Sequence, residues 1–136
     1  MEQSGNKIMK IKSIHHIAII TNDYETSKKF YTDTLGFEVI REVYRKERDS
    51  YKLDLSVNGK YQIELFSFPD YRERAGYPEA KGLRHLAFAV ANVEEAAKEL
   101  KLKGVNVENI RIDEFTGKKF TFFNDPNGQP LELYEE

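Results

Sequence analysis

The chain contains a weak internal repeat, and this repeat limits the possible folds more than any other feature of the sequence. The segment Ser13–Ile20 aligns with Gly82–Ala89, and the alignment sets His16 against His85. In both segments an alanine follows the histidine by two residues, within an apolar run. Two such copies in one chain predict two similar modules that share one core.

Each copy continues with a predicted helix. The helices are expected to start at Asn-x-x-Glu sequences, with Asn22 and Asn92 as N-caps, because this pattern resembles a capping box. They are expected to end at Gly36 and Gly104, since a helix C-terminus commonly needs a residue with positive φ.

After each glycine the apolar residues alternate with a period of two, which is typical of strands. A two-residue hairpin is predicted at Asn58-Gly59. The expected strands are Phe37–Tyr44, Leu53–Val57 and Tyr61–Phe66 in the first copy, and Val105–Ile112, Phe120–Phe123 and Leu131–Tyr134 in the second. Each half is therefore predicted to have the order β-α-β-β-β.

The sequence predicts an α+β fold in which two βαβββ modules, related by pseudo-twofold symmetry, form one curved-sheet cavity. At 136 residues the chain suits one domain, expected to span 12–135. Module one covers about 12–68, a linker 69–81, and module two about 82–135. Residues 1–11 are expected to be a disordered extension.

Composition excludes several classes of function. The formal net charge is −2 and the charges are spread along the chain, so no basic surface for nucleic acid is expected. The absence of cysteine excludes disulfides and thiolate metal sites. No apolar run approaches the roughly 20 residues of a membrane span, and the polar start lacks the apolar region of a signal peptide. A soluble, cytoplasmic protein without membrane or nucleic-acid partners is expected.

The repeat also places polar residues at matched positions. Glu64 lies in the apolar sequence Ile-Glu-Leu and Glu132 in Leu-Glu-Leu, each in the last strand of its module. From His16 to Glu64 is 48 residues, and from His85 to Glu132 is 47. Strand alternation places each histidine on the same face as the alanine that follows it, and the small alanine leaves space for a cavity.

These four side chains predict a metal site. A carboxylate within an apolar strand is costly unless it is paired or binds a cation. Two imidazoles and two carboxylates suit Zn²⁺, Ni²⁺, Co²⁺ or Fe²⁺. A single histidine or glutamate in a strand is more often structural or solvated, but the repeated set favours the metal. His15 is expected on the opposite strand face from His16, in a structural role.

At this point the residues resemble the vicinal oxygen chelate superfamily. The resemblance covers about residues 12–135 and is closest to the glyoxalase I branch. It rests on the motifs His15-His16-Ile-Ala-Ile, Ile63-Glu-Leu, Arg84-His-Leu-Ala-Phe-Ala-Val and Asp125-Pro-Asn-Gly-Gln-Pro-Leu-Glu-Leu. It implies paired βαβββ modules, a homodimer, and one divalent ion (Zn, Ni or Co) per site, held by His16, Glu64, His85 and Glu132.

The resemblance further implies a lyase of the lactoylglutathione type. Such an enzyme isomerises a hemithioacetal of methylglyoxal to a lactoyl thioester by proton transfer through an enediolate. The resemblance makes Glu132 the better candidate for the base, with Glu64 as second metal ligand and catalytic partner. Ile20 and Phe68 stand where glutathione-using members carry arginine and asparagine, so glutathione is not favoured as the thiol.

Other functions of the superfamily stay open at this stage. One is a non-catalytic binder of small molecules that resembles bleomycin-resistance proteins. Others are an extradiol dioxygenase, a fosfomycin-modifying transferase or an epimerase. The sequence leaves undecided the substrate, the native metal, and whether each site is built from one chain or two.

Overall fold

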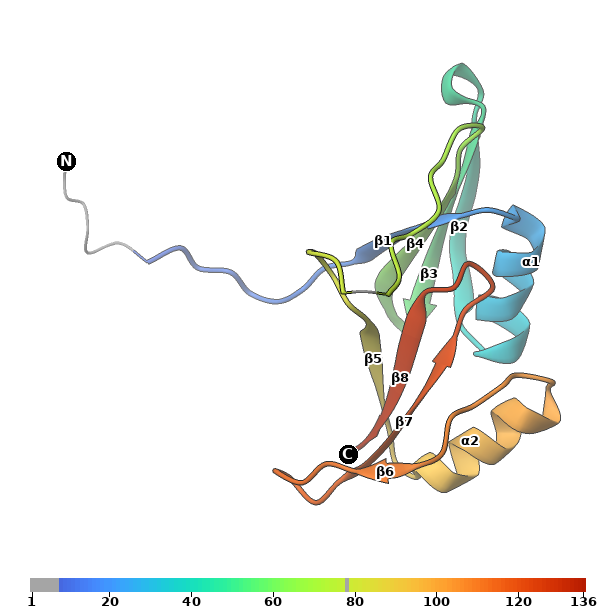
Figure 1. The fold of residues 1–136 in the computed structure, drawn as a ribbon. Coiled ribbons are helices and arrows are strands. Elements are labelled where there is room, and N and C mark those ends of the chain that lie inside the picture. Colours follow the sequence, from blue (N-terminus) through green and yellow to red (C-terminus); the bar gives the residue numbers. More distant parts are fainter. Residues whose placement is uncertain (1–7, 78) are drawn as a thin grey trace.

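The computed structural model describes residues 8–77 and 79–136 (Figure 1). The predicted α+β fold and the βαβββ order of both modules are confirmed. Module one contains β1 (Ile17–Thr21), α1 (Tyr24–Lys29), a π-helical turn (Phe30–Thr34), β2 (Glu38–Arg45), a 3₁₀ turn (Lys46–Arg48), β3 (Ser50–Val57) and β4 (Lys60–Ser67). Module two contains β5 (Leu86–Val90), α2 (Val93–Leu102), β6 (Arg111–Ile112), β7 (Lys119–Asn124) and β8 (Pro130–Glu135).

The two modules build sheets of the same topology. Their strand orders are β1-β4-β3-β2 and β5-β8-β7-β6, and the first strand of each module pairs in parallel with its last. Ala18 lies opposite Glu64 in one sheet, and Ala87 lies opposite Glu132 in the other. The pseudo-twofold relation read from the repeat therefore extends to the register, and a small side chain neighbours each candidate glutamate.

The start of α1 differs from its prediction. Asp23, not Asn22, is the N-cap, and its carboxylate accepts a hydrogen bond from the backbone N–H of Thr26 at 3.2 Å. The cap must directly precede the first helical residue, so Asn22 lies one position too early. The prediction for α2 is confirmed, because the Asn92 side chain accepts from the N–H of Glu95.

The predicted ends of the helical segments are confirmed. Gly36 and Gly104 have φ angles of 79° and 87°, a region that side chains rarely adopt. The predicted hairpin is also present, since Asn58 and Gly59 join β3 to β4 with φ angles of 51° and 81°. Two consecutive positive φ angles fit a tight hairpin between twisted strands.

The strand predicted over 105–112 is the largest difference from the expected elements. Only Arg111–Ile112 forms a strand, and Val107 makes an isolated bridge to Phe123. Between them the N–H of Glu108 bonds to the carbonyl of Phe122. The segment thus follows β7 without a continuous ladder.

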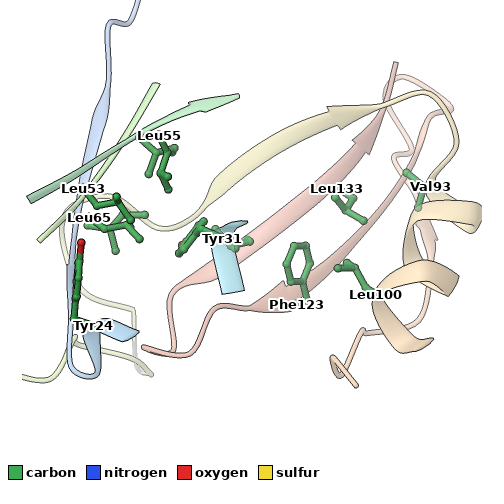
Figure 2. Close-up of a cluster of buried hydrophobic side chains, with 12 residues drawn as sticks. Tyr24, Tyr31, Leu53, Leu55, Leu65, Val93, Leu100, Phe123 and Leu133 are labelled. Atoms are coloured by element: carbon green, nitrogen blue, oxygen red, sulfur yellow. The ribbon is translucent and has the colours of Figure 1, made fainter. Parts of the chain in front are cut away.

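One core cluster contains side chains from both modules. Figure 2 shows Tyr31 between leucines of the first sheet and Phe123 with Leu133 of the second. Tyr31 is fully buried, and its hydroxyl donates to Asp125 Oδ2 at 2.7 Å. Burial and the Asp125 carboxylate raise the pKa of Tyr31 far above its usual range. This bond joins the helical segment of module one to the β7–β8 turn of module two.

Residues 8–11 lead away from the modules (Figure 1). Residues 8–11 are exposed and lie outside helices and strands. The remainder of the predicted extension, residues 1–7, lies outside the described residues, and the domain limits at 12 and 135 stay predictions. Among the described helices, none combines the length and the hydropathy that a membrane span needs.

Candidate metal centre

The first predicted pair is brought together in module one. His16 directly precedes β1, and Glu64 lies in β4, the strand that pairs with β1. The Nε2 atom of His16 is 3.3 Å from Glu64 Oε2. The glutamate is 7% exposed, so its carboxyl group is buried beside an accessible imidazole.

Glu64 has further polar neighbours that hold its carboxylate in place. The hydroxyl of Tyr61 donates to Oε2 of Glu64, and Lys52 Nζ lies 3.6 Å from the same oxygen. Lys52 also donates to Asp54 Oδ1 at 2.7 Å, and Arg41 donates to Asp54 Oδ2 at 2.8 Å. Glu64 is therefore fixed within a network of five polar side chains on one sheet face.

The charges in this network determine its protonation. Burial would raise the pKa of Asp54, but hydrogen bonds from Lys52, Tyr61 and Arg41 outweigh burial and hold that pKa below its usual range. Burial and hydrogen bonds to Glu64 and Asp54 raise the pKa of Tyr61. Asp54 is therefore ionised and Tyr61 keeps its proton at neutral pH, so the tyrosine acts as a donor.

The second predicted pair is brought together in module two. His85 directly precedes β5, and Glu132 lies in the paired strand β8. The Nε2 atom of His85 is 3.0 Å from Glu132 Oε1, and the glutamate is 9% exposed. The His85 ring meets Phe122 edge-on, with 5.0 Å between the ring centroids.

The two glutamates have different surroundings. Phe122 lies opposite Glu132 in the second sheet, whereas Asp54 lies opposite Glu64 in the first. Among the residues that the structure describes, His85 is the one side chain that hydrogen-bonds or ion-pairs with Glu132. Glu132 is thus less constrained than Glu64.

His15 does not take the expected position on the face opposite His16. Its Nδ1 lies 2.8 Å from His16 Nδ1, and its ring centroid is 5.2 Å from that of Tyr61. The prediction was wrong because β1 begins at Ile17, so strand alternation does not govern the two preceding residues. His15 instead contacts Nδ1 of His16, the ring nitrogen that does not face Glu64.

The four predicted ligands form two pairs in the single chain. Within residues 8–77 and 79–136, no group of three or more His, Asp or Glu side chains is arranged to hold a metal ion. The His16–Glu64 pair belongs to one sheet and the His85–Glu132 pair to the other. The cavity expected to receive all four side chains is not formed by one described chain.

The network around Glu64 was not predicted, although the sequence contains a signal for part of it. Asp54 lies in Leu53-Asp-Leu55, the same context of a carboxylate in an apolar strand that identified Glu64. Tyr61 and Lys52 carry no such signal, because a tyrosine or lysine is common at strand ends and on half-exposed faces.

Comparison with known proteins identifies the family. A sequence profile described as the glyoxalase/bleomycin resistance protein/dioxygenase superfamily matches residues 13–133. The chain belongs to this superfamily. The predicted resemblance is thereby confirmed, as is the fold class.

Similar proteins match over nearly their whole length. The chain is 64% identical to the protein YwkD of Bacillus subtilis (strain 168), with 94% of this chain and 100% of YwkD covered. It is 57% identical to YaeR of Escherichia coli (strain K12), with 95% and 100% covered. A crystal structure of a glyoxalase family protein from Enterococcus faecalis is 49% identical, with a TM-score of 0.86 over 93% of this chain and 100% of that one.

More distant relatives include enzymes of several kinds. A 2-epi-5-epi-valiolone epimerase from Actinomyces sp is 28% identical, over 96% of this chain and 82% of the relative. A manganese-dependent 2,3-dihydroxybiphenyl 1,2-dioxygenase from Geobacillus genomosp. 3 is 31% identical, over 92% and 37%. The glyoxalase I of Leishmania major is 25% identical, with a TM-score of 0.67 over 93% and 88%. The names of these relatives thus cover three different reactions.

Proposed function

We propose that this protein is a metal-dependent, glyoxalase I-like lyase that isomerises a small carbonyl or hemithioacetal-type substrate. The observation that carries the proposal is the pair of buried glutamates, each within 3.3 Å of a histidine Nε2 and each beside an alanine. Two imidazole nitrogens and two carboxylates fit Zn²⁺, Ni²⁺ or Co²⁺.

We further propose that a homodimer completes the site. The His16–Glu64 pair of one chain faces the His85–Glu132 pair of the partner subunit, because one chain holds the pairs apart. In support, Ile14 and Leu83 each lie two residues before a candidate histidine and are 70% and 80% exposed in the single chain. Exposed apolar side chains at matched positions favour burial against a second protein surface.

The two glutamates take different parts in the proposed reaction. A bound divalent ion would hold two substrate oxygens and stabilise negative charge that develops on them. Glu64, held by Tyr61 and Lys52, stays in place as a ligand. Glu132 has the freedom to take a proton from the carbon beside the substrate oxygen and return it to the adjacent carbon.

The surface around the first pair favours a thiol other than glutathione. Ile20 is 54% exposed and lies opposite Phe66 in the sheet, so the apolar position noted in the sequence faces solvent in the single chain. Phe68 stacks on Phe66 with 5.8 Å between the ring centroids. An apolar surface of this kind suits a small thiol or an apolar substrate segment.

The test is formation of a thioester from methylglyoxal hemithioacetals of several thiols, with protein loaded separately with Ni²⁺, Co²⁺ and Zn²⁺. Turnover should require metal, and Glu132→Gln should lower it by about 100-fold or more, as expected for loss of a general base. Metal binding without thioester formation from any thiol would contradict the glyoxalase proposal. Racemisation or epimerisation of a small 2-hydroxy acid derivative would then support proton transfer in an epimerase, the function of one distant relative.

A further inference from the structure

Arg45 lies on the sheet face that carries Glu64. Its guanidinium carbon is 4.9 Å from the ring centroid of Phe66 and 5.6 Å from that of Phe68. Phe66 follows Glu64 by two residues in β4, so the two side chains share one face. At about 3.3 Å per residue, Phe66 and Phe68 lie roughly 7 and 13 Å from Glu64 along the strand.

The positive charge of Arg45 has no negative partner within the part of the chain that the structure describes. Its Nη2 donates to Ser50 Oγ at 2.9 Å, and no carboxylate lies within 4.0 Å of its nitrogens. Among residues 8–77 and 79–136, Nε of Arg45 is the one buried side-chain nitrogen or oxygen without a hydrogen-bond partner. A half-buried guanidinium without a counter-charge, and with one N–H unbonded, costs free energy unless an anion binds to it.

Module two provides an informative contrast. Arg111 lies over Phe120 and Phe122 at 5.1 and 5.5 Å, which repeats the arrangement of an arginine over two phenylalanines. Arg111, however, donates to Glu108 Oε1 at 3.0 Å and so has its own counter-charge. An arginine that packs on two aromatic rings can therefore keep a counter-charge. The absence of one at Arg45 is not a consequence of this packing.

Between Glu64 and Arg45 this face carries two aromatic rings and one cation, Lys52, which lies opposite Phe66 and donates to Asp54. Phe66 and Phe68 are stacked at 13° between their ring planes, and exposed Ile20 lies opposite Phe66 in the neighbouring strand. Along β4 the order is a candidate metal ligand and then two stacked rings, with the guanidinium of Arg45 over those rings.

We propose that the substrate is a carboxylate with two chelating oxygens at its other end, and that Arg45 binds the carboxylate. This inference rests on the proposed function, since the chelating end is the part held at the metal. The planar fork of the guanidinium matches the two oxygens of a carboxylate. The apolar middle of the substrate lies across Phe66 and Phe68. Arg45 is thus a determinant of specificity at a distance from the reacting carbons.

A first experiment tests the carboxylate site without metal. In metal-free protein labelled with ¹⁵N, the Arg45 Nε–H signal, identified by its loss in Arg45→Lys, should shift on titration with octanoate and stay unchanged with octanol. The exposed Arg48 serves as the control, and its signal should respond to neither compound. Equal responses at Arg45 and Arg48, or no response to millimolar octanoate, would overturn the carboxylate site.

A second experiment tests the distance between the two ends of the substrate. Suberic acid monohydroxamate and octanohydroxamate have the same chelating group and chain length, and they differ only in the terminal carboxylate. Zn²⁺-loaded protein should bind the first about 10-fold to 100-fold more tightly by calorimetry, as expected for hydrogen bonds to a charged group. Arg45→Gln should remove this preference and leave octanohydroxamate binding unchanged, whereas Arg48→Gln should keep it.

The outcomes separate this inference from the proposed function. Equal binding of both hydroxamates by the wild type, or a preference that survives in Arg45→Gln, overturns the role of Arg45 and leaves the metal site standing. A shift of the Arg45 signal with octanoate in a protein that binds no Zn²⁺ supports the carboxylate site and contradicts the proposed function. Circular dichroism of Arg45→Gln and Arg45→Lys checks that both variants are folded.

Discussion

Glu64 and Glu132 occupy equivalent positions in the two sheets, but their neighbours give them different freedom. Tyr61 and Lys52 contact the Glu64 carboxylate in addition to His16, and Asp54 fixes Lys52 in turn. Glu132 has His85 on one side and the ring of Phe122 opposite it. At the scale of single residues, a fixed ligand and a less constrained base can therefore coexist in one symmetric framework.

The contact from Tyr61 should matter for metal affinity. We expect Tyr61→Phe to weaken Zn²⁺ or Ni²⁺ binding by about tenfold or more, because hydrogen bonds to ligating side chains hold them in position. Competition with a chromophoric chelator measures the affinity. Tyr44→Phe is the matched control, since the Tyr44 hydroxyl binds Asp49 in an exposed turn at 2.6 Å. Wild-type affinity in Tyr61→Phe would show that the network around Glu64 does not support the metal.

At the scale of elements, α1 is joined to β2 through Glu42. The Tyr24 hydroxyl donates to Glu42 Oε2 at 2.5 Å, and Lys28 Nζ lies 3.0 Å from the same oxygen. The hydrogen bond from Tyr24, followed by the hydrogen bond and charge of Lys28, lowers the pKa of Glu42 despite partial burial. These contacts hold the helix over the sheet whose other face carries Glu64.

This pKa shift predicts a pH dependence of stability. The carboxyl of Glu42 has a lower pKa in the folded than in the unfolded chain, so its contribution is fully present above about pH 4.3, the unfolded value. The contribution is lost as the pH falls through the lower folded pKa. Glu42→Gln should reduce the free energy of unfolding by about 1 kcal/mol at pH 7, and by less in acid.

Urea denaturation at pH 7 and at pH 3 measures this difference. Glu47→Gln, in the exposed turn after β2, is the control and should have little effect at either pH. An equal loss of stability in Glu42→Gln at both pH values would mean that the charge of Glu42 is not what stabilises the contact.

The sequence predicted helix ends and turns correctly where the conformation of one or two residues decides the local structure. The glycines at the helix ends and the Asn58-Gly59 hairpin were found because positive φ angles leave a clear trace in composition. The strand over 105–112 was overestimated, because apolar alternation cannot show whether a neighbouring strand continues to pair. Asn22 was predicted as the cap because Glu25 follows it by three residues, as in a capping box, whereas the helix starts directly after Asp23.

The sequence predicted the candidate ligands of the site but not the side chains around them. Repeat spacing singled out His16, Glu64, His85 and Glu132, and the structure brings each histidine to its own glutamate. The roles of Lys52 and Tyr61 depend on which side chains meet across β3 and β4. This register cannot be derived from a single sequence. The separation of the two pairs is likewise a property of tertiary structure.

At the scale of the whole molecule, the modules are held to each other by their core, by the β7–β8 turn, and by Lys103, whose Nζ donates to the carbonyl of Thr34 at 2.9 Å. The β7–β8 turn meets the segments on both sides of α1, where the N–H of Asn22 donates to Asn127 Oδ1 at 2.8 Å and Tyr31 donates to Asp125 (Figure 1). These contacts fix the modules in an arrangement that keeps the two His–Glu pairs apart. A second copy of the chain is then the source of the missing ligands in our account.

The most direct test of this account mixes two variant chains with different affinity tags. One chain carries His16→Ala with Glu64→Gln, and the other carries His85→Ala with Glu132→Gln. Neither variant alone should hold Zn²⁺ tightly, because every site in its dimer would keep only two ligands. The purified mixed dimer should bind one Zn²⁺ with wild-type affinity, since one of its two sites contains all four native ligands. A mixed dimer without tight metal binding, beside a wild type that binds metal, would contradict a site shared between two chains.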